Sequence, residues 1–83
     1  MITKEDVQTW LVKRLAKELK VTEDQIDLQR SFSTYGIDSL AAVTITADLE
    51  DYIQCQLLRN VFWEYPNIAL ISEYIEELVS EKA

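Results

Sequence analysis

The sequence of 83 residues has no histidine, and it has only one cysteine, one glycine and one proline. Without histidine, the chain lacks the commonest general base and the commonest metal ligand in proteins. A single cysteine excludes an internal disulfide and favours a reducing intracellular compartment. The scarcity of glycine and proline argues against a disordered chain and against a turn-rich β-protein.

Long apolar runs and an excess of positive charge are also missing. No stretch is apolar enough to span a membrane, and the N-terminus is too charged for a signal peptide, so we expect a cytoplasmic protein. The 8 Lys and Arg residues are outnumbered by 15 Asp and Glu, which gives a formal net charge of −7. This charge opposes binding to nucleic acid or anionic lipid and favours a basic protein partner.

Apolar residues are abundant, at 48% of the chain, and they recur at helical spacing. The pattern predicts an all-α fold of four helices, over residues 4–19, 39–53, 61–65 and from 68 onward. Thr3 and Asp6 form a capping box for the first helix, and Asn67 caps the last. Pro66 ends the short third helix, because the residue before a proline is pushed out of the helical region.

Residues 20–38 show no sustained period, and we expect a long loop there that is tacked onto the core by apolar side chains. Thr22 and Gln25 form a second possible capping box, sufficient for a single turn. Gly36 ends the loop and predicts a backbone conformation that is costly for other residues. The whole chain, residues 1–83, is expected to form one monomeric domain.

The predicted helix over residues 39–53 has two apolar sides. Ile45, Leu49 and Ile53 are spaced by four and form a stripe that faces the core. A second face is mixed apolar and acidic, and it contains Leu40, Val43, Thr44, Ala47, Asp48 and Asp51. A second face of this kind is either a binding surface or a solvated surface with chance apolar residues, and the pattern favours neither interpretation.

The main candidate site lies where this helix begins, in the run Gly36-Ile37-Asp38-Ser39-Leu40. A hydroxyl at a helix start lies where backbone N–H groups lack intrahelical partners and where the helix dipole favours an anion. Asp38 or Ser39 could equally be a simple helix cap, which is the commonest role of these residues. With no histidine and no cysteine–base pair to activate it, Ser39 must be acted upon by another protein.

This run resembles the signature of the acyl carrier protein family, which includes the carrier domains of polyketide and nonribosomal peptide synthases. The resemblance extends over nearly the whole chain, through Phe32, Val43, Ile45, Leu49, Glu50 and the segment Trp63-Glu64-Tyr65-Pro66. It implies a four-helix acyl-carrier-like bundle with a short third helix and a long loop between helices one and two. It also implies that Ser39 carries 4′-phosphopantetheine, which a phosphopantetheinyl transferase attaches from coenzyme A.

The resemblance further implies that acyl groups are tethered as thioesters on this arm by a non-catalytic carrier. The implied partners are an acyltransferase or ligase, a ketosynthase and other synthase enzymes, and no metal is implied. The surface that these partners read would comprise Asp38, Leu40, Val43, Thr44, Ala47, Asp48 and Asp51. Thr44 stands where the family often has Glu, and Gln54 and Leu58 replace a frequent glycine and proline, so the second helix is expected to end later or less sharply.

We expect service in polyketide-type or related specialised acyl biosynthesis, with a peptidyl carrier or a fatty-acid carrier as alternatives. An acidic helical adaptor without a prosthetic group is the alternative from another class, and a serine hydrolase is disfavoured because it lacks a base. Met1 and the lack of a linker favour a freestanding protein over an excised domain. Cys55 is expected to be a partly buried structural thiol, and the aromatic residues Trp10, Phe62, Trp63 and Tyr74 are expected in the core.

Overall fold

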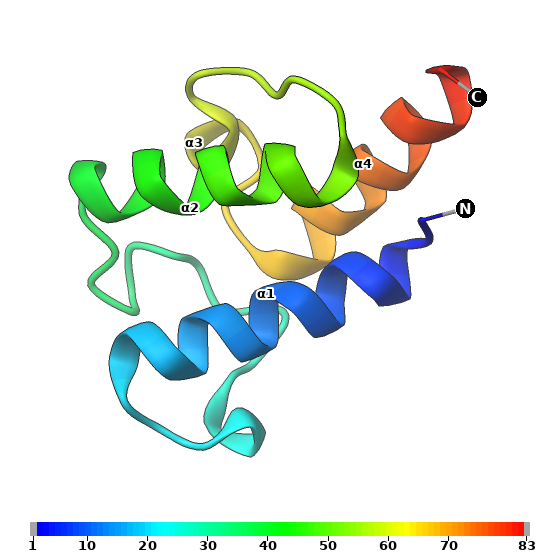
Figure 1. Ribbon diagram of the computed structural model, residues 1–83. Coiled ribbons are helices and arrows are strands. Elements are labelled where there is room, and N and C mark those ends of the chain that lie inside the picture. The colour runs from blue at the N-terminus through cyan, green and yellow to red at the C-terminus, as the bar shows by residue number, and fades with distance from the viewer. Residues whose placement is uncertain (1, 83) are drawn as a thin grey trace.

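The computed structural model describes residues 2–82 and contains a helical bundle (Figure 1). Its elements are α1 (Lys4–Leu19), a single 3₁₀ turn η1 (Glu23–Gln25), α2 (Ser39–Ile53), α3 (Val61–Glu64) and α4 (Ile68–Lys82). The described residues contain no β-strand, which confirms the all-α prediction. The predicted bounds of the first two helices are also confirmed. No helix in the described part of the chain has both the length and the apolar character that crossing a bilayer requires.

The start of α1 is held by its own cap and by α4. Thr3 Oγ1 accepts a hydrogen bond from the Asp6 N–H, and Asp6 Oδ2 accepts one from the Thr3 N–H, so the predicted capping box is confirmed. The Lys4 N–H donates to Glu76 Oε2 of α4 at 2.8 Å. An acidic side chain from α4 therefore satisfies one of the N–H groups that a helix start leaves without an intrahelical partner.

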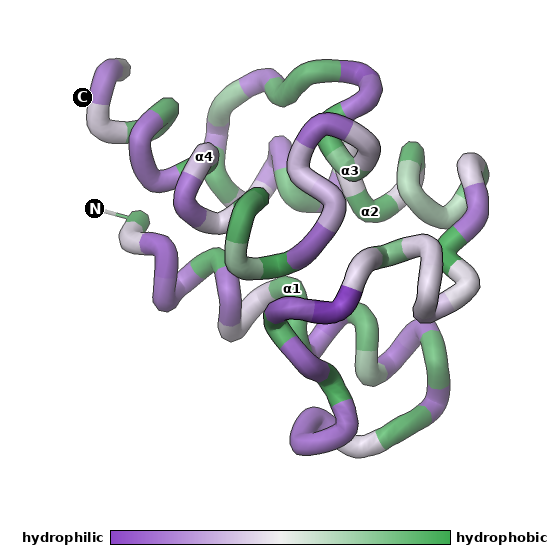
Figure 2. Tube along the Cα trace, turned by 180° about the vertical axis from the view of Figure 1, so that it is seen from behind, coloured by the Kyte–Doolittle hydropathy of each residue, from purple (hydrophilic) through white to green (hydrophobic). Residues whose placement is uncertain are grey.

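The core lies between α1, α2 and α4, and each helix gives one face to it. Figure 2 shows hydrophilic and hydrophobic residues alternating along α1, as the sequence periodicity predicts. The buried side chains are Val7, Leu11 and Leu15 of α1, Ala42, Ile45, Leu49 and Ile53 of α2, and Ile68, Ile71 and Ile75 of α4, with Phe32, Val61 and Phe62 beside them. The core stripe predicted for α2 is thus confirmed.

The long loop between α1 and α2 is tied to the beginning of α4. The Phe32 N–H donates to the Pro66 carbonyl at 2.8 Å, and the Ala69 N–H donates to the Leu28 carbonyl at 3.1 Å. The buried Phe32 ring packs edge-on against Phe62, with 4.6 Å between ring centroids. These contacts explain how a loop without periodicity still brings Ser39 to one fixed place.

Gly36 has a φ of +78°, so the backbone reason predicted for this glycine is confirmed. The prediction of a second capping box, at Thr22 and Gln25, is wrong. Thr22 makes no side-chain bond to the η1 backbone and its hydroxyl instead bonds the Asp24 carboxylate. The Gln25 N–H that the Thr22 hydroxyl would cap already donates to the Thr22 carbonyl at 3.1 Å, so this hydroxyl bonds the neighbouring carboxylate instead.

The end of α2 is sharper than the sequence suggests. Gln54 takes the left-handed conformation, with a φ of 57°, and its N–H donates to the Glu50 carbonyl at 2.8 Å. The Gln54 side-chain amide donates to the Asp51 carbonyl at 2.6 Å, which gives this strained position a local partner. The expectation of a later or less sharp helix end is therefore wrong, because glutamine fills the role that glycine usually has.

Candidate functional site

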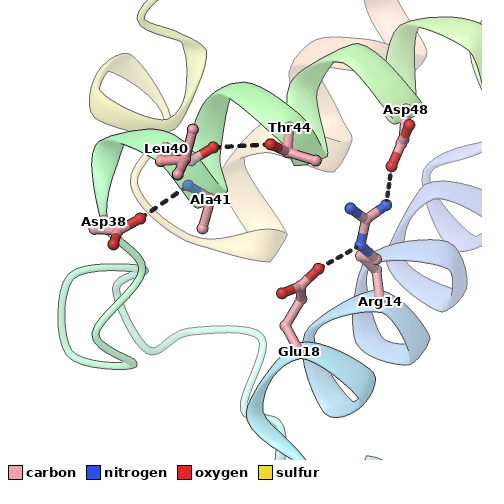
Figure 3. A network of polar contacts seen from close by, with 7 residues as sticks. All are labelled: Arg14, Glu18, Asp38, Leu40, Ala41, Thr44 and Asp48. Atoms are coloured by element: carbon pink, nitrogen blue, oxygen red, sulfur yellow. Dashed lines mark hydrogen bonds and ion pairs between the residues drawn. The ribbon is translucent and has the colours of Figure 1, made fainter.

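Ser39 is the first residue of α2, at the end of the molecule opposite the two termini (Figure 1). Asp38 is the N-cap, and its Oδ1 accepts a hydrogen bond from the Ala41 N–H at 2.8 Å (Figure 3). The cap is therefore Asp38, and Ser39 is left out of this role. Ser39 is exposed, and within residues 2–82 its hydroxyl makes no hydrogen bond. Another protein can reach this hydroxyl without breaking any contact within the chain.

A groove runs beside Ser39, between the first turns of α2 and the segment that leads into α3. We call it the Ser39 groove, and its lining residues are Ser39, Ala42, Val43, Arg59, Asn60, Phe62 and Trp63. A second hollow continues along α2, which we call the Leu57 groove, lined by Val43, Thr46, Ala47, Glu50, Leu57 and Arg59. Arg59 and Val43 belong to both grooves, so the two hollows share a wall.

Sequence reasoning misses the groove residues that come from outside α2. Arg59 and Asn60 lie in a segment without periodicity, and nothing in their spacing places them beside Ser39. The expectation that Trp63 lies in the core is wrong, because its side chain is 55% exposed. A helix of four residues makes barely one turn, so its pattern cannot show which side faces outward. Of the other aromatic residues expected in the core, Phe62 is buried, whereas Trp10 and Tyr74 are only half-buried.

A single hydrogen bond fixes the chain that forms the far wall of these grooves. The Leu57 N–H donates to Glu50 Oε2 at 2.6 Å, which ties the segment after α2 back onto the last turn of that helix. The two residues are seven positions apart, so the bond closes a short loop. Arg59 follows two residues later, between this closure and the buried Val61.

The outward face of α2 is apolar near Ser39. Leu40 is 76% exposed and Val43 is 63% exposed, with Thr44 and Ala47 exposed between and beyond them. The Thr44 hydroxyl donates to the Leu40 carbonyl at 3.0 Å and so satisfies itself within the helix (Figure 3). Exposed large apolar residues that cluster on one helix face are typical of a docking surface.

Two of the three acidic residues predicted for this surface, Asp48 and Asp51, lie farther along α2. The Asp48 carboxylate points toward α1 and forms an ion pair with Arg14, which also bonds Glu18 at 3.1 Å (Figure 3). Partial burial lowers the pKa of Arg14, but hydrogen bonds and attraction from Asp48 and Glu18 outweigh it and raise the pKa above its ordinary value. Asp48 is therefore already paired within the chain, whereas Asp51 is exposed near the end of α2.

Cys55 lies after α2, half-buried, as expected for a structural thiol. It is far along the helix from Ser39, and it lines neither the Ser39 groove nor the Leu57 groove. The described residues hold no group of three or more side chains that could bind a metal ion. The groups that this end of the molecule presents include the Ser39 hydroxyl, the Arg59 guanidinium and the exposed apolar side chains of Leu40 and Val43.

The fold and the site together define a small helical bundle that presents an exposed serine at a helix start. The chain belongs to the family described as "Phosphopantetheine attachment site", whose sequence profile matches residues 9–75. It is a carrier domain homologous to acyl carrier and peptidyl carrier proteins. Carriers of this family hold a covalently attached 4′-phosphopantetheine arm and are generally non-catalytic.

The chain is similar to acyl carrier protein TtuC of Teredinibacter turnerae, with 43% identity over 51 residues, which are 61% of this chain and 59% of TtuC. It is 25% identical over 75 residues to a phenolphthiocerol/phthiocerol polyketide synthase of Mycobacterium tuberculosis, covering 90% of this chain. The aligned part is only 4% of that synthase polypeptide. A free-standing peptidyl carrier protein from a secondary metabolic pathway of Acinetobacter baumannii has the same fold, with a TM-score of 0.82, 34% identity and 98% of each chain covered.

The residues around Ser39 fit the group that the family carries. The hydroxyl is exposed and unbonded within the described chain, so it is available for ester formation. Asn60 and Arg59 line the adjoining groove as polar partners, and Phe62, Trp63 and Val43 supply apolar walls. A phosphodiester followed by an aliphatic chain matches this mixture of polar and apolar lining.

Proposed function

We propose that residues 1–83 form a single carrier domain whose prosthetic arm is attached at Ser39. The observation that carries this proposal is the position of Ser39, which is exposed at the first residue of α2 in a chain of the phosphopantetheine-attachment family. When bound, the arm supplies a thiol that holds acyl groups as thioesters. The chain itself positions that arm, because Asp38 fixes the helix start and leaves the Ser39 hydroxyl free.

The modification comes from a phosphopantetheinyl transferase that uses coenzyme A. The chain has no histidine, Cys55 lines neither groove at Ser39, and the neighbouring Asp38 carboxylate caps the helix by accepting the Ala41 N–H, so the chain offers no histidine–serine or cysteine–base pair to activate the serine. The same lack supports a non-catalytic carrier, whose contribution is to raise the effective concentration of substrate at each partner's active site. Such a carrier acts in the cytoplasm alongside its synthase enzymes.

The cargo belongs to polyketide-type or related specialised acyl assembly. The likeness to TtuC and to a polyketide synthase supports acyl cargo, whereas the likeness to a peptidyl carrier favours an aminoacyl cargo as the second candidate. The partners are an acyltransferase or ligase, a ketosynthase and further synthase enzymes. They dock on the exposed face of α2, where Asp38, Leu40, Val43, Thr44 and Ala47 surround the attachment point and Asp48 and Asp51 lie beyond.

The test begins with intact-protein mass after incubation with coenzyme A and a promiscuous phosphopantetheinyl transferase. We expect a gain of one phosphopantetheine in the wild type and none in Ser39→Ala. The holo protein is then offered malonyl-coenzyme A with an acyltransferase or an amino acid with an adenylating enzyme, and we expect loading by the first. Loading by the second alone would replace the acyl cargo with a peptidyl role, and no mass gain on folded protein would leave the adaptor function.

A further inference from the structure

Among the described residues, Arg59 is the one cation that lines the grooves beside Ser39. It contributes to the wall of both the Ser39 groove and the Leu57 groove. Arg14, by comparison, lies between α1 and α2 and is held by two carboxylates. The two arginines therefore differ in a specific way: one is committed to the fold and the other faces a hollow.

Within residues 2–82, Arg59 forms no ion pair. The single carboxylate that the described chain places in the two grooves belongs to Glu50, and it accepts the Leu57 N–H at 2.6 Å. Within residues 2–82 only Arg14 forms an ion pair, so Arg59 is distinguished by its place in the two grooves rather than by its lack of a carboxylate partner. Because Arg59 follows the Glu50-anchored turn by two residues, the fold keeps this charge near the attachment serine.

The start of α2 does not supply a strong positive field of its own. The N-cap Asp38 places a carboxylate at this helix end and accepts the Ala41 N–H. That carboxylate offsets the partial positive charge that an uncapped helix start presents to an anion. A cation outside the helix therefore adds attraction for a phosphodiester on Ser39 that the capped helix start supplies only weakly, and Arg59 is the cation that lines the same groove.

We propose that Arg59 binds the phosphodiester of the arm on Ser39 and holds the first atoms of that arm in the Ser39 groove. This inference rests on the proposed function. A guanidinium bonds two phosphate oxygens at once, which an ammonium cannot do with the same geometry. The branched aliphatic carbons that follow the phosphate then meet the apolar walls at Val43, Phe62 and Trp63. Arg59 is a binding residue in this account and takes no part in bond formation.

The exposure of Arg59 makes this contact weak and reversible. An exposed ion pair contributes about 0–1 kcal/mol and is screened by salt, so the arm spends only part of its time in the groove. A carrier needs such a balance, because the arm must swing into a partner's active site. The arm is expected to be more ordered near its root at low salt than at high salt.

The test uses the intact domain in its apo and holo forms, observed by phosphorus and nitrogen NMR. In the wild type we expect the phosphorus resonance to be displaced from that of a short phosphopantetheinyl-serine peptide, and the Trp63 indole N–H to shift between apo and holo protein. Arg59→Ala should lose both shifts, and Arg59→Lys should retain only part of them. Raising the salt to about 0.5 M should reduce the wild-type shifts, because the Debye length falls below about 5 Å.

The matched control is Lys13→Ala, which removes the same charge from an exposed position on α1 that lines neither groove. It should leave both shifts as they are in the wild type. Equal phosphorus and indole shifts in wild type and Arg59→Ala would overturn the assignment of Arg59 while leaving the carrier function intact. Failure of Ser39 to accept the arm in any folded variant would instead remove the proposed function itself.

Discussion

The two faces of α2 differ in what they contact and therefore in what they do. The inward face, with Ile45 and Leu49 fully buried, packs into the core between α1 and α4. The outward face, with Leu40 and Val43 mostly exposed, begins at Ser39 and borders the two grooves. One side of the helix thus stabilises the fold, and the other side presents Ser39 and the exposed apolar residues to solvent and to partner proteins.

The contrast between the buried and the exposed face of α2 explains how so small a domain can offer a binding surface without loss of folding stability. Exposed apolar side chains contribute little to folding, because they stay in contact with water in both states. They are free to be used by a partner. The charged residues also fall into two groups. Asp48 and Arg14 are paired within the fold, whereas Arg59 lines the grooves beside Ser39.

The largest expected effect is on the free energy of unfolding, and it is seen when a truncation on the inward face of α2 is compared with one on the outward face. Ile45→Ala removes buried methyl groups and should lower the free energy of unfolding by about 2–5 kcal/mol. Val43→Ala removes exposed ones and should change it by no more than about 0.5 kcal/mol. Urea denaturation followed by circular dichroism measures both. A loss at Val43 as large as that at Ile45 would show that the outward face is part of the core.

The helix cap is the next largest effect. Asp38→Ala removes the acceptor of the Ala41 N–H and should lower the free energy of unfolding by about 1 kcal/mol. Asp38→Asn keeps a side-chain oxygen at the cap and is the matched control, with most of the stability retained. Ser39→Ala should be nearly neutral, because Ser39 is exposed and is not the cap. A destabilisation by Ser39→Ala that exceeds that of Asp38→Ala would contradict this assignment of the cap.

The smallest expected effect separates Asp48 and Asp51, the two acidic residues that the sequence predicts for the partner surface along α2. Asp48→Lys breaks the pair with Arg14 and should destabilise by about 0.2–1 kcal/mol, whereas Asp51→Lys should leave stability unchanged. If partners read this surface through its acids, each reversal should slow transfer to a partner enzyme, and more at low salt. The measurement is the rate of acyl transfer from each holo variant to a partner enzyme, compared with the melting curve of the same variant. Unchanged rates in both variants would place docking on the apolar residues near Ser39.

Much of the fold is readable from the sequence because local signals agree with one another. The bounds of α1 and α2, the Thr3 cap and the positive φ at Gly36 follow from helical spacing and backbone chemistry. The Asn67 cap is confirmed as well, since its Oδ1 accepts the Leu70 N–H at 2.8 Å. Each of these features depends on residues within a few positions of one another.

The features that could not be predicted depend on contacts between distant or aperiodic residues. The pairing of Asp48 with Arg14 joins residues 34 positions apart, and no local pattern links them. Arg59 lines the Ser39 groove in a segment that is held at one end by the bond from Leu57 to Glu50 and at the other by the buried Val61 and Phe62. The outward position of Trp63 follows from how its short helix packs, which a four-residue pattern cannot indicate. The attachment of the arm at Ser39 stays a prediction.

The most direct test of the central claim is to find which residue carries the arm after modification. The folded domain is treated with coenzyme A and a phosphopantetheinyl transferase, digested, and mapped by tandem mass spectrometry. We predict that the arm is found only on Ser39, and that the other serines, Ser31, Ser33, Ser72 and Ser80, stay unmodified. Modification of another serine, or none at all on folded protein, would contradict the assignment of Ser39 as the attachment residue.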